Sequence, residues 1–177
     1  MALNIFSEID ITSTGDDFYE AIEKCKDNWA IVDAGSNQIT TATTTLTTSQ
    51  VNNLRATPIS LVAAPGSGYW LEFKGATLSY NYTTTAFTVG ADEDFIIRYD
   101  GGAGSDLTAS IESAGFIDQT NDEIRYFPPA TWTVTDDVVT IVNKKIEIFN
   151  TGAGETSAGG TSTLIVKVMY MKHATGL

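Results

Sequence analysis

Hydrophobic and polar residues alternate along most of the chain, which is the pattern of strands that bury one face. After Pro58, for example, Ile59, Leu61 and Ala63 alternate with small or polar neighbours. Segments with this two-residue period, separated by Gly, Asn, Asp and Pro clusters, are 58–64, 69–74, 76–82, 94–99, 131–135, 138–149 and 162–172. So many short strands with no helical pattern between them predict an all-β fold, an antiparallel β-sandwich or jelly-roll-like domain.

The clearest strand patterns are the last two, 138–149 and 162–172. The phase of the first is interrupted at 143–145, as a bulge or a turn would interrupt it. Between the two strands lies the glycine-rich loop 151–160. We expect this loop to project from the domain and to pack little.

One helical pattern covers residues 13–29, so we expect a short N-terminal α-helix at about 14–29. Its large side chains follow one another at steps of four, three and four and form one stripe: Phe18, Ile22, Cys25 and Trp29. The stripe either docks on the β domain of its own chain or packs against copies of itself in an oligomer. Because so short a helix is marginal alone in water, we interpret it as an oligomerisation or attachment helix.

The chain is long enough for one ordinary domain and an appendage. From residue 36 to 48 it is rich in threonine, which predicts an extended connector that enters a first strand. The sequence therefore predicts an N-terminal attachment arm over 1–42 and a β-sandwich domain over 43–177.

The charge balance disfavours several classes of partner. With 10 Lys and Arg against 22 Asp and Glu, the net charge is -12, whereas nucleic-acid binding needs clustered cations. We therefore expect no nucleic acid and no anionic membrane as partners. No apolar run approaches the roughly 18 residues of a membrane helix, and no secretory signal pattern begins the chain, so we expect no membrane insertion. Cys25 is the single cysteine, which excludes a disulfide within one chain.

Residues for catalysis are scarce. His173, the only histidine, lies close to the C-terminus, where chains usually fray, so a histidine triad is not expected. The acidic clusters, such as 92–94, lack the spacing of a calcium loop, and we interpret them as solvated loops. No phosphate-binding loop, nucleophile elbow or paired-histidine metal motif occurs. We predict no enzymatic activity, no cofactor and no metal site.

Aromatic residues are the strongest remaining signal. Neighbouring aromatic residues in a strand point to opposite faces, so some must face outward, and the candidates are Tyr69, Trp70 and Tyr126. Outward aromatic side chains mark subunit contacts or platforms on which sugars stack, and we favour subunit contacts. In the sugar-binding alternative, the loops 100–106 and 151–160 would supply polar contacts.

The order of several segments resembles a β domain found in structural proteins of tailed bacteriophages. These segments are TTTLTTSQVNNLRATPISLVAAPGSGYWLEFKGATLSYNYTTTAFT, FIIRYDGG, FIDQTNDEI and IEIFNTGAGETSAGGTSTLIVKVMYMKH, which together span about residues 43–173. The N-terminal GDDFYEAIEKCKDNWAIVD is similar to the short helical segment with which many phage fibre and appendage proteins begin.

This resemblance implies a virion protein assembled in the bacterial cytoplasm, with a homotrimer as the expected state. Its N-terminal part would attach to the particle and its sandwich would be displayed. The expected role is non-enzymatic, as a decoration or cement protein of the capsid or as a fibre component of head or tail. The expected partners are further copies of the chain and other capsid or tail proteins. The alternative is a receptor-binding module that contacts glycans on the host surface.

Overall fold

The computed structural model of the protein describes residues 38–90, 93–100, 105–130, 138–152 and 156–175. All of them belong to the unit Asn37–Leu177. They form the antiparallel β-sandwich that the alternation predicts, so the all-β fold class is confirmed. The N-terminal helix expected at 14–29, with its stripe Phe18, Ile22, Cys25 and Trp29, and the strand expected at 131–135 lie outside the described residues. The division into 1–42 and 43–177 stays a prediction.

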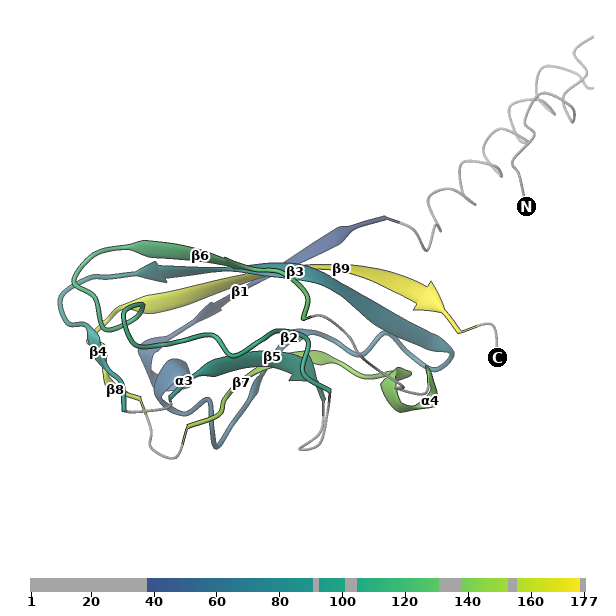
Figure 1. Cartoon of the computed structure of the whole chain (residues 1–177), viewed down its shortest axis with the longest axis horizontal. Coiled ribbons are helices and arrows are strands. Elements are labelled where there is room, and N and C mark those ends of the chain that lie inside the picture. Colours follow the sequence, from purple (N-terminus) through teal and green to yellow (C-terminus); the bar gives the residue numbers. More distant parts are fainter. Residues whose placement is uncertain (1–37, 91–92, 101–104, 131–137, 153–155, 176–177) are drawn as a thin grey trace, which may run out of the picture. The chain divides into compact units, whose positions relative to one another are not determined.

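Two main sheets form the layers of the sandwich (Figure 1). The four-stranded sheet has the order β1 (Thr40–Leu46), β9 (Thr163–Ala174), β3 (Tyr69–Asn81) and β6 (Glu123–Phe127). The three-stranded sheet has the order β2 (Ile59–Val62), β7 (Ile146–Asn150) and β5 (Phe95–Tyr99). The small elements are β4 (Phe87–Thr88), which pairs with β8 (Ser157–Ala158), and the short helices α3 (Thr48–Asn52) and α4 (Val138–Ile141).

Alternation in the two long strands builds the core. Leu78 of β3 and Val166 of β9 are directly paired and fully buried, whereas their neighbours along each strand face away from the core. The two segments expected at 69–74 and 76–82 are one strand, joined by a shift of register at Gly75. Gly75 has a φ of 140°, so the bulge requires glycine at this position.

The strand expected over 138–149 is only half correct. Val138–Ile141 forms helix α4, and the strand is limited to Ile146–Asn150. A short apolar run has no decisive period, so its sequence does not separate helix from strand. The interruption at 143–145 is confirmed as a turn, since Asn143 has a φ of 56° and its N–H donates to the Tyr69 carbonyl at 2.8 Å.

The expectation that loop 151–160 packs little holds only in part, because some of its described residues are exposed and others are buried. Thr156 is buried, and Ser157–Ala158 forms a strand that pairs with Phe87–Thr88. Gly159 has a φ of 94°, and a Cβ atom there would lie 2.5 Å from a carbon of the Phe87 ring. The loop therefore closes one end of the core, because its glycines permit close approach of the backbone to an aromatic ring.

Besides helix α4 and the small strands β4 and β8, the described part of the chain contains β1, α3 and β6, which were not expected. The threonine-rich run is itself the edge strand β1, paired along its length with β9. Helix α3 follows it with a capping box, in which Thr47 and Gln50 exchange side-chain and backbone hydrogen bonds. Strand β6 was also missed. Within the described part of the chain, no helix is long and apolar enough to cross a membrane.

Candidate functional site

The outer face of the four-stranded sheet is the broadest candidate surface. The strand pairings align its side chains in three central rows. These rows are Thr41–Met169–Gly75, Thr43–Lys167–Thr77–Tyr126 and Thr45–Ile165–Ser79–Ile124. Lys167 is the one charged residue in them, although the chain has 32 charged side chains, 10 basic and 22 acidic. We name these rows the outer face; it is a nearly uncharged surface of hydroxyl, methyl and thioether groups.

Two large side chains protrude from one side of the outer face. Ile124 is 71% exposed and Tyr126 is 58% exposed, both from strand β6. The position of Tyr126 depends on Gly75, because a Cβ atom there would lie 2.8 Å from the Tyr126 hydroxyl. Apolar side chains this exposed, surrounded by polar residues, are typical of a contact with another molecule.

A cluster of aromatic and charged side chains lies where β3 begins and β9 ends. The Trp70 and His173 rings are stacked with centroids 4.6 Å apart, and His173 Nε2 lies 2.9 Å from Glu72 Oε2. The other carboxylate oxygen, Oε1, accepts a hydrogen bond from Lys74 Nζ at 2.5 Å. Partial burial by itself raises the pKa of Glu72, but the hydrogen bonds and charges of Lys74 and His173 outweigh it and hold that pKa below its ordinary value.

The expectation that His173 frays is wrong. Strand β9 continues to Ala174, which pairs with Tyr69, so the backbone around the histidine is part of a ladder. Within the described residues, its ring hydrogen-bonds to Glu72 and stacks on Trp70. These contacts hold the ends of two strands together.

The expected outward aromatic residues have different exposures. Tyr126 is the most exposed of the three, and Tyr69 is 41% exposed, with Lys172 Nζ 4.0 Å from its ring centroid. Trp70 is partly buried, because it packs against the core. Sequence reasoning missed Ile124, since strand β6 itself was missed.

Beside Trp70 the surface is hollowed by a cavity of about 360 Å³. Its lining is Trp70, Glu72, Phe73, Lys74, Tyr99, Pro129 and Ile141. The Tyr99 hydroxyl donates to the Leu71 carbonyl, which joins the two sheets behind the cavity. Apolar walls with one carboxylate and one ammonium group suit a small ligand that has both apolar and hydroxyl surface.

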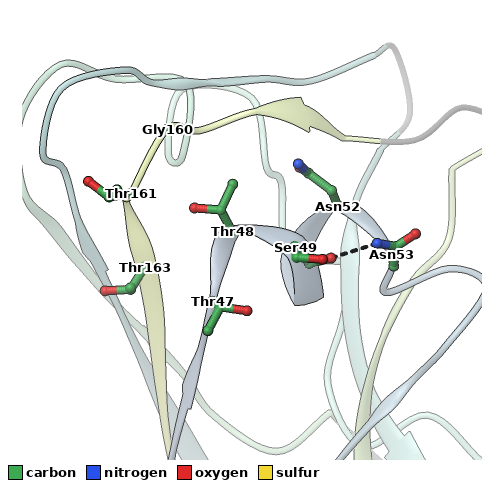
Figure 2. Close-up of a pocket in the computed structure, with 8 residues that line it drawn as sticks. All are labelled: Thr47, Thr48, Ser49, Asn52, Asn53, Gly160, Thr161 and Thr163. Atoms are coloured by element: carbon green, nitrogen blue, oxygen red, sulfur yellow. Dashed lines mark hydrogen bonds between the residues drawn. The ribbon is translucent and has the colours of Figure 1, made fainter.

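A second groove, of about 600 Å³, lies between helix α3 and the start of β9 (Figure 2). Thr47, Thr48, Ser49, Asn52 and Asn53 line one side, and Gly160, Thr161 and Thr163 line the other. Its lining contains no charged residue. Several of its polar groups are already bonded within the chain: Thr48 Oγ1 donates to the Ser162 carbonyl at 2.7 Å, and Asn53 Nδ2 donates to the Ser49 carbonyl at 2.7 Å. The groove is thus an uncharged surface, and hydrogen bonds within the chain hold several of the side chains that line it.

The acidic cluster at 92–94 was expected to be a solvated loop, and for one residue this is wrong. Glu93 is 1% exposed, packed against Gly90 and Gly152. Its neighbour Asp94 accepts a hydrogen bond from the Ser110 hydroxyl. Among the described residues, no three His, Cys, Asp or Glu side chains come together as a metal ion requires.

No protein-family model matches the chain, and no curated protein matches it. Among solved structures, a chain of the capsid asymmetric unit of cyanophage Pam1 is similar, with a TM-score of 0.40 and 14% identity. The similarity covers 76% of this chain and 83% of the capsid chain. We draw no functional argument from a likeness this distant.

Proposed function

We propose that the chain is a non-enzymatic structural protein of a bacteriophage virion. It decorates the capsid as a cement protein or forms part of a head or tail fibre. The observation that carries the proposal is the outer face, with Ile124 71% exposed and Tyr126 58% exposed beside rows that contain one charge. In a protein of net charge -12, this sheet surface with Lys167 as its one charge suits contact with a neighbouring protein.

The exposed apolar side chains of the outer face contribute a modest contact energy in each copy, which a particle repeats many times. Complete burial of a large apolar side chain contributes roughly 1.5 to 3 kcal/mol. Ile124 and Tyr126 supply two such side chains, and Ile165 and Met169 lie in the same rows. Many identical contacts in a particle add such contributions together.

The order of the segments between residues 43 and 173, which resembles phage structural proteins, supports the same proposal. In it, the arm 1–42 attaches the protein to the particle and the sandwich is displayed. Deleting residues 1–35 is then expected to leave a folded β domain that is no longer incorporated into particles. If the truncated chain unfolds, the arm is instead part of the core of the domain, and the attachment role is refuted.

The proposed assembly unit is a homotrimer, in which the N-terminal stripe and the sheet surfaces share the interface. Sedimentation equilibrium of the intact chain at micromolar concentration tests it directly. A species of three times the chain mass, or of six times that mass where two trimers pair, supports the homotrimer, and a monomer refutes it.

The test of virion membership uses particles of the phage that encodes the chain, purified on a density gradient. We expect mass spectrometry to find the protein at a fixed copy number per particle. The variant Ile124→Asp should be lost from the particles, because it places a charge in the contact. The control Thr120→Asp changes an exposed residue that is not in the three rows of the outer face, and this variant should be retained. A chain absent from wild-type particles refutes the proposal.

A second candidate function is binding of a host-surface glycan, and the cavity beside Trp70 is the observation that favours it. An indole can stack on a sugar ring while Glu72 and Lys74 bond its hydroxyl groups. Titration with oligosaccharides from the host surface tests this function. Binding that is lost in Trp70→Ala and retained in Tyr126→Ala supports it, and no binding by the intact protein excludes it.

A further inference from the structure

Strand β1 leaves one edge of the four-stranded sheet open. It pairs with β9 along one side over its 7 residues, and no described residue pairs with its other side. The strand TTATTTL contains no charged residue, no proline and no bulge. An edge of this kind is a ready template for pairing with another strand.

In the described part of the chain, the other edges of the two main sheets are protected. Strand β6 carries Glu123 and Arg125 and is followed by two prolines. Strand β5 is covered by bridges to Ile111 and Asp106. Strand β2 has 4 residues and a register shift. Charges, prolines, short length and covering segments are the usual means by which proteins block edge pairing, and β1 has none of them.

We propose that β1 pairs with β1 of a second copy of the chain, antiparallel, about a twofold axis at Thr43. This register pairs all 7 residues of the strand. Odd-numbered residues pair with odd-numbered ones and even with even, so the outer faces of both copies lie on the same side of the joined sheet. The pairs are Thr43 with Thr43, Thr41 with Thr45, Ala42 with Thr44 and Thr40 with Leu46. The two four-stranded sheets then continue into one another.

The charge distribution selects a second copy as the occupant. Two chains of net charge -12 repel each other, so a contact between copies needs a surface without like charges. Residues 34–54 contain no charged side chain. Opposed threonines are also a favourable cross-strand combination, because their hydroxyl and methyl groups both find partners.

An exposed residue and a groove agree with this register. Ile39 is 61% exposed immediately before β1. Continuing the pairing by one residue places Ile39 of the second copy opposite Thr47, which lines the neutral groove of about 600 Å³ together with Thr48 and Thr163 (Figure 2). In each copy Ile39 is then covered by the other copy, and the groove is contacted by the other copy's Ile39, because a twofold interface repeats every contact.

This pairing goes beyond the proposed function and does not rest on it, because it concerns the purified chain alone. It uses the edge of the sheet and leaves Ile124 and Tyr126 of the outer face free. Two single chains would form a dimer by this contact, and two trimers would form a hexamer. In either case, loss of the contact halves the mass of the assembly.

The first experiment is sedimentation equilibrium of the full chain and of Thr43→Lys. In the variant two ammonium groups face each other across the axis, so we expect the mass to halve and the dissociation constant of the contact to rise at least about tenfold. Thr43→Val keeps the branched shape and should associate as the wild type does. Thr120→Lys adds the same charge at an exposed residue elsewhere and should leave the mass unchanged. A mass that Thr43→Lys does not change overturns the proposal.

The second experiment tests the register by disulfide trapping in a Cys25→Ser background. Thr43→Cys should form a covalent dimer under mild oxidation, because residue 43 faces its own copy. Thr41→Cys should not, because its copy lies four residues away, roughly 13 Å along the strand. No cross-link at residue 43, or equal cross-linking at residue 41, overturns the proposed pairing. Circular dichroism of each variant verifies that the fold is retained.

Discussion

Glu147 in strand β7 provides a quantitative test of the three-stranded sheet. Its side chain is 4% exposed, and its two carboxylate oxygens have separate cationic partners. Arg98 Nε lies 3.0 Å from Oε1, and Lys145 Nζ lies 3.2 Å from Oε2. The Arg98 guanidinium also lies over the Phe149 ring, 4.0 Å from its centroid. The substitution Glu147→Met keeps the approximate length of the side chain and removes the charge.

The expected cost follows from what remains after the substitution. Breaking a buried ion pair by removing one partner costs about 3 to 5 kcal/mol, because the other charge stays buried. Arg98 is 13% exposed and Lys145 is 32% exposed, so water partly solvates both cations once the carboxylate is gone. We therefore expect Glu147→Met to lower the free energy of unfolding by about 2 to 3 kcal/mol, slightly less than for a fully buried pair.

Urea unfolding followed by circular dichroism measures this change, and a double-mutant cycle isolates its cause. The double variant Arg98→Met/Glu147→Met removes both charges and should recover more than half of the loss. Arg98→Met alone should also be destabilised, since it leaves Glu147 with Lys145 only. A cost below about 1 kcal/mol for Glu147→Met, or simple additivity in the double variant, would refute the ion-pair reasoning.

Two further predictions concern the glycine-rich loop and the cluster at the end of β9. Gly159→Ala should lower the free energy of unfolding by about 2 to 4 kcal/mol, because the φ of 94° is unfavourable for alanine and its Cβ would lie 2.5 Å from the Phe87 ring; an unchanged melting temperature contradicts packing by this loop. Burial raises the pKa of Glu72 in the folded protein, but Lys74 and His173 lower it by more, so the folded pKa lies below the unfolded one. Ionised Glu72 should therefore stabilise the fold at pH values above the pKa that it has in the unfolded chain. The difference in the free energy of unfolding between wild type and Glu72→Gln should therefore shrink as the pH falls below about 5, through the lowered folded pKa of Glu72. Parallel pH profiles for the two proteins contradict this linkage.

The alternation of apolar and polar residues is enough to predict the fold class and the buried face of the two longest strands, β3 and β9. Alternation places Leu78 and Val166 on one face of their strands, and this period-two pattern depends only on local backbone geometry. The interruption at 143–145 follows from the same pattern. For Tyr126 the pattern shows only that it and Phe127 point to opposite faces of a strand. These features are predictable because each one depends only on a few consecutive residues.

The order of the strands in each sheet, and the edge of β1 that no described residue pairs with, depend on tertiary packing. Strand β6 carries weak strand signals, and its place beside β3 depends on contacts distant in sequence. The burial of Glu147 likewise requires Arg98 from β5, 49 residues away along the chain. The cluster of Trp70, Glu72 and His173 exists because β9 runs antiparallel to β3 and brings its last residues beside the first residues of β3. Pairings of this kind depend on the free energy of the whole sandwich, so no local pattern of residues specifies them.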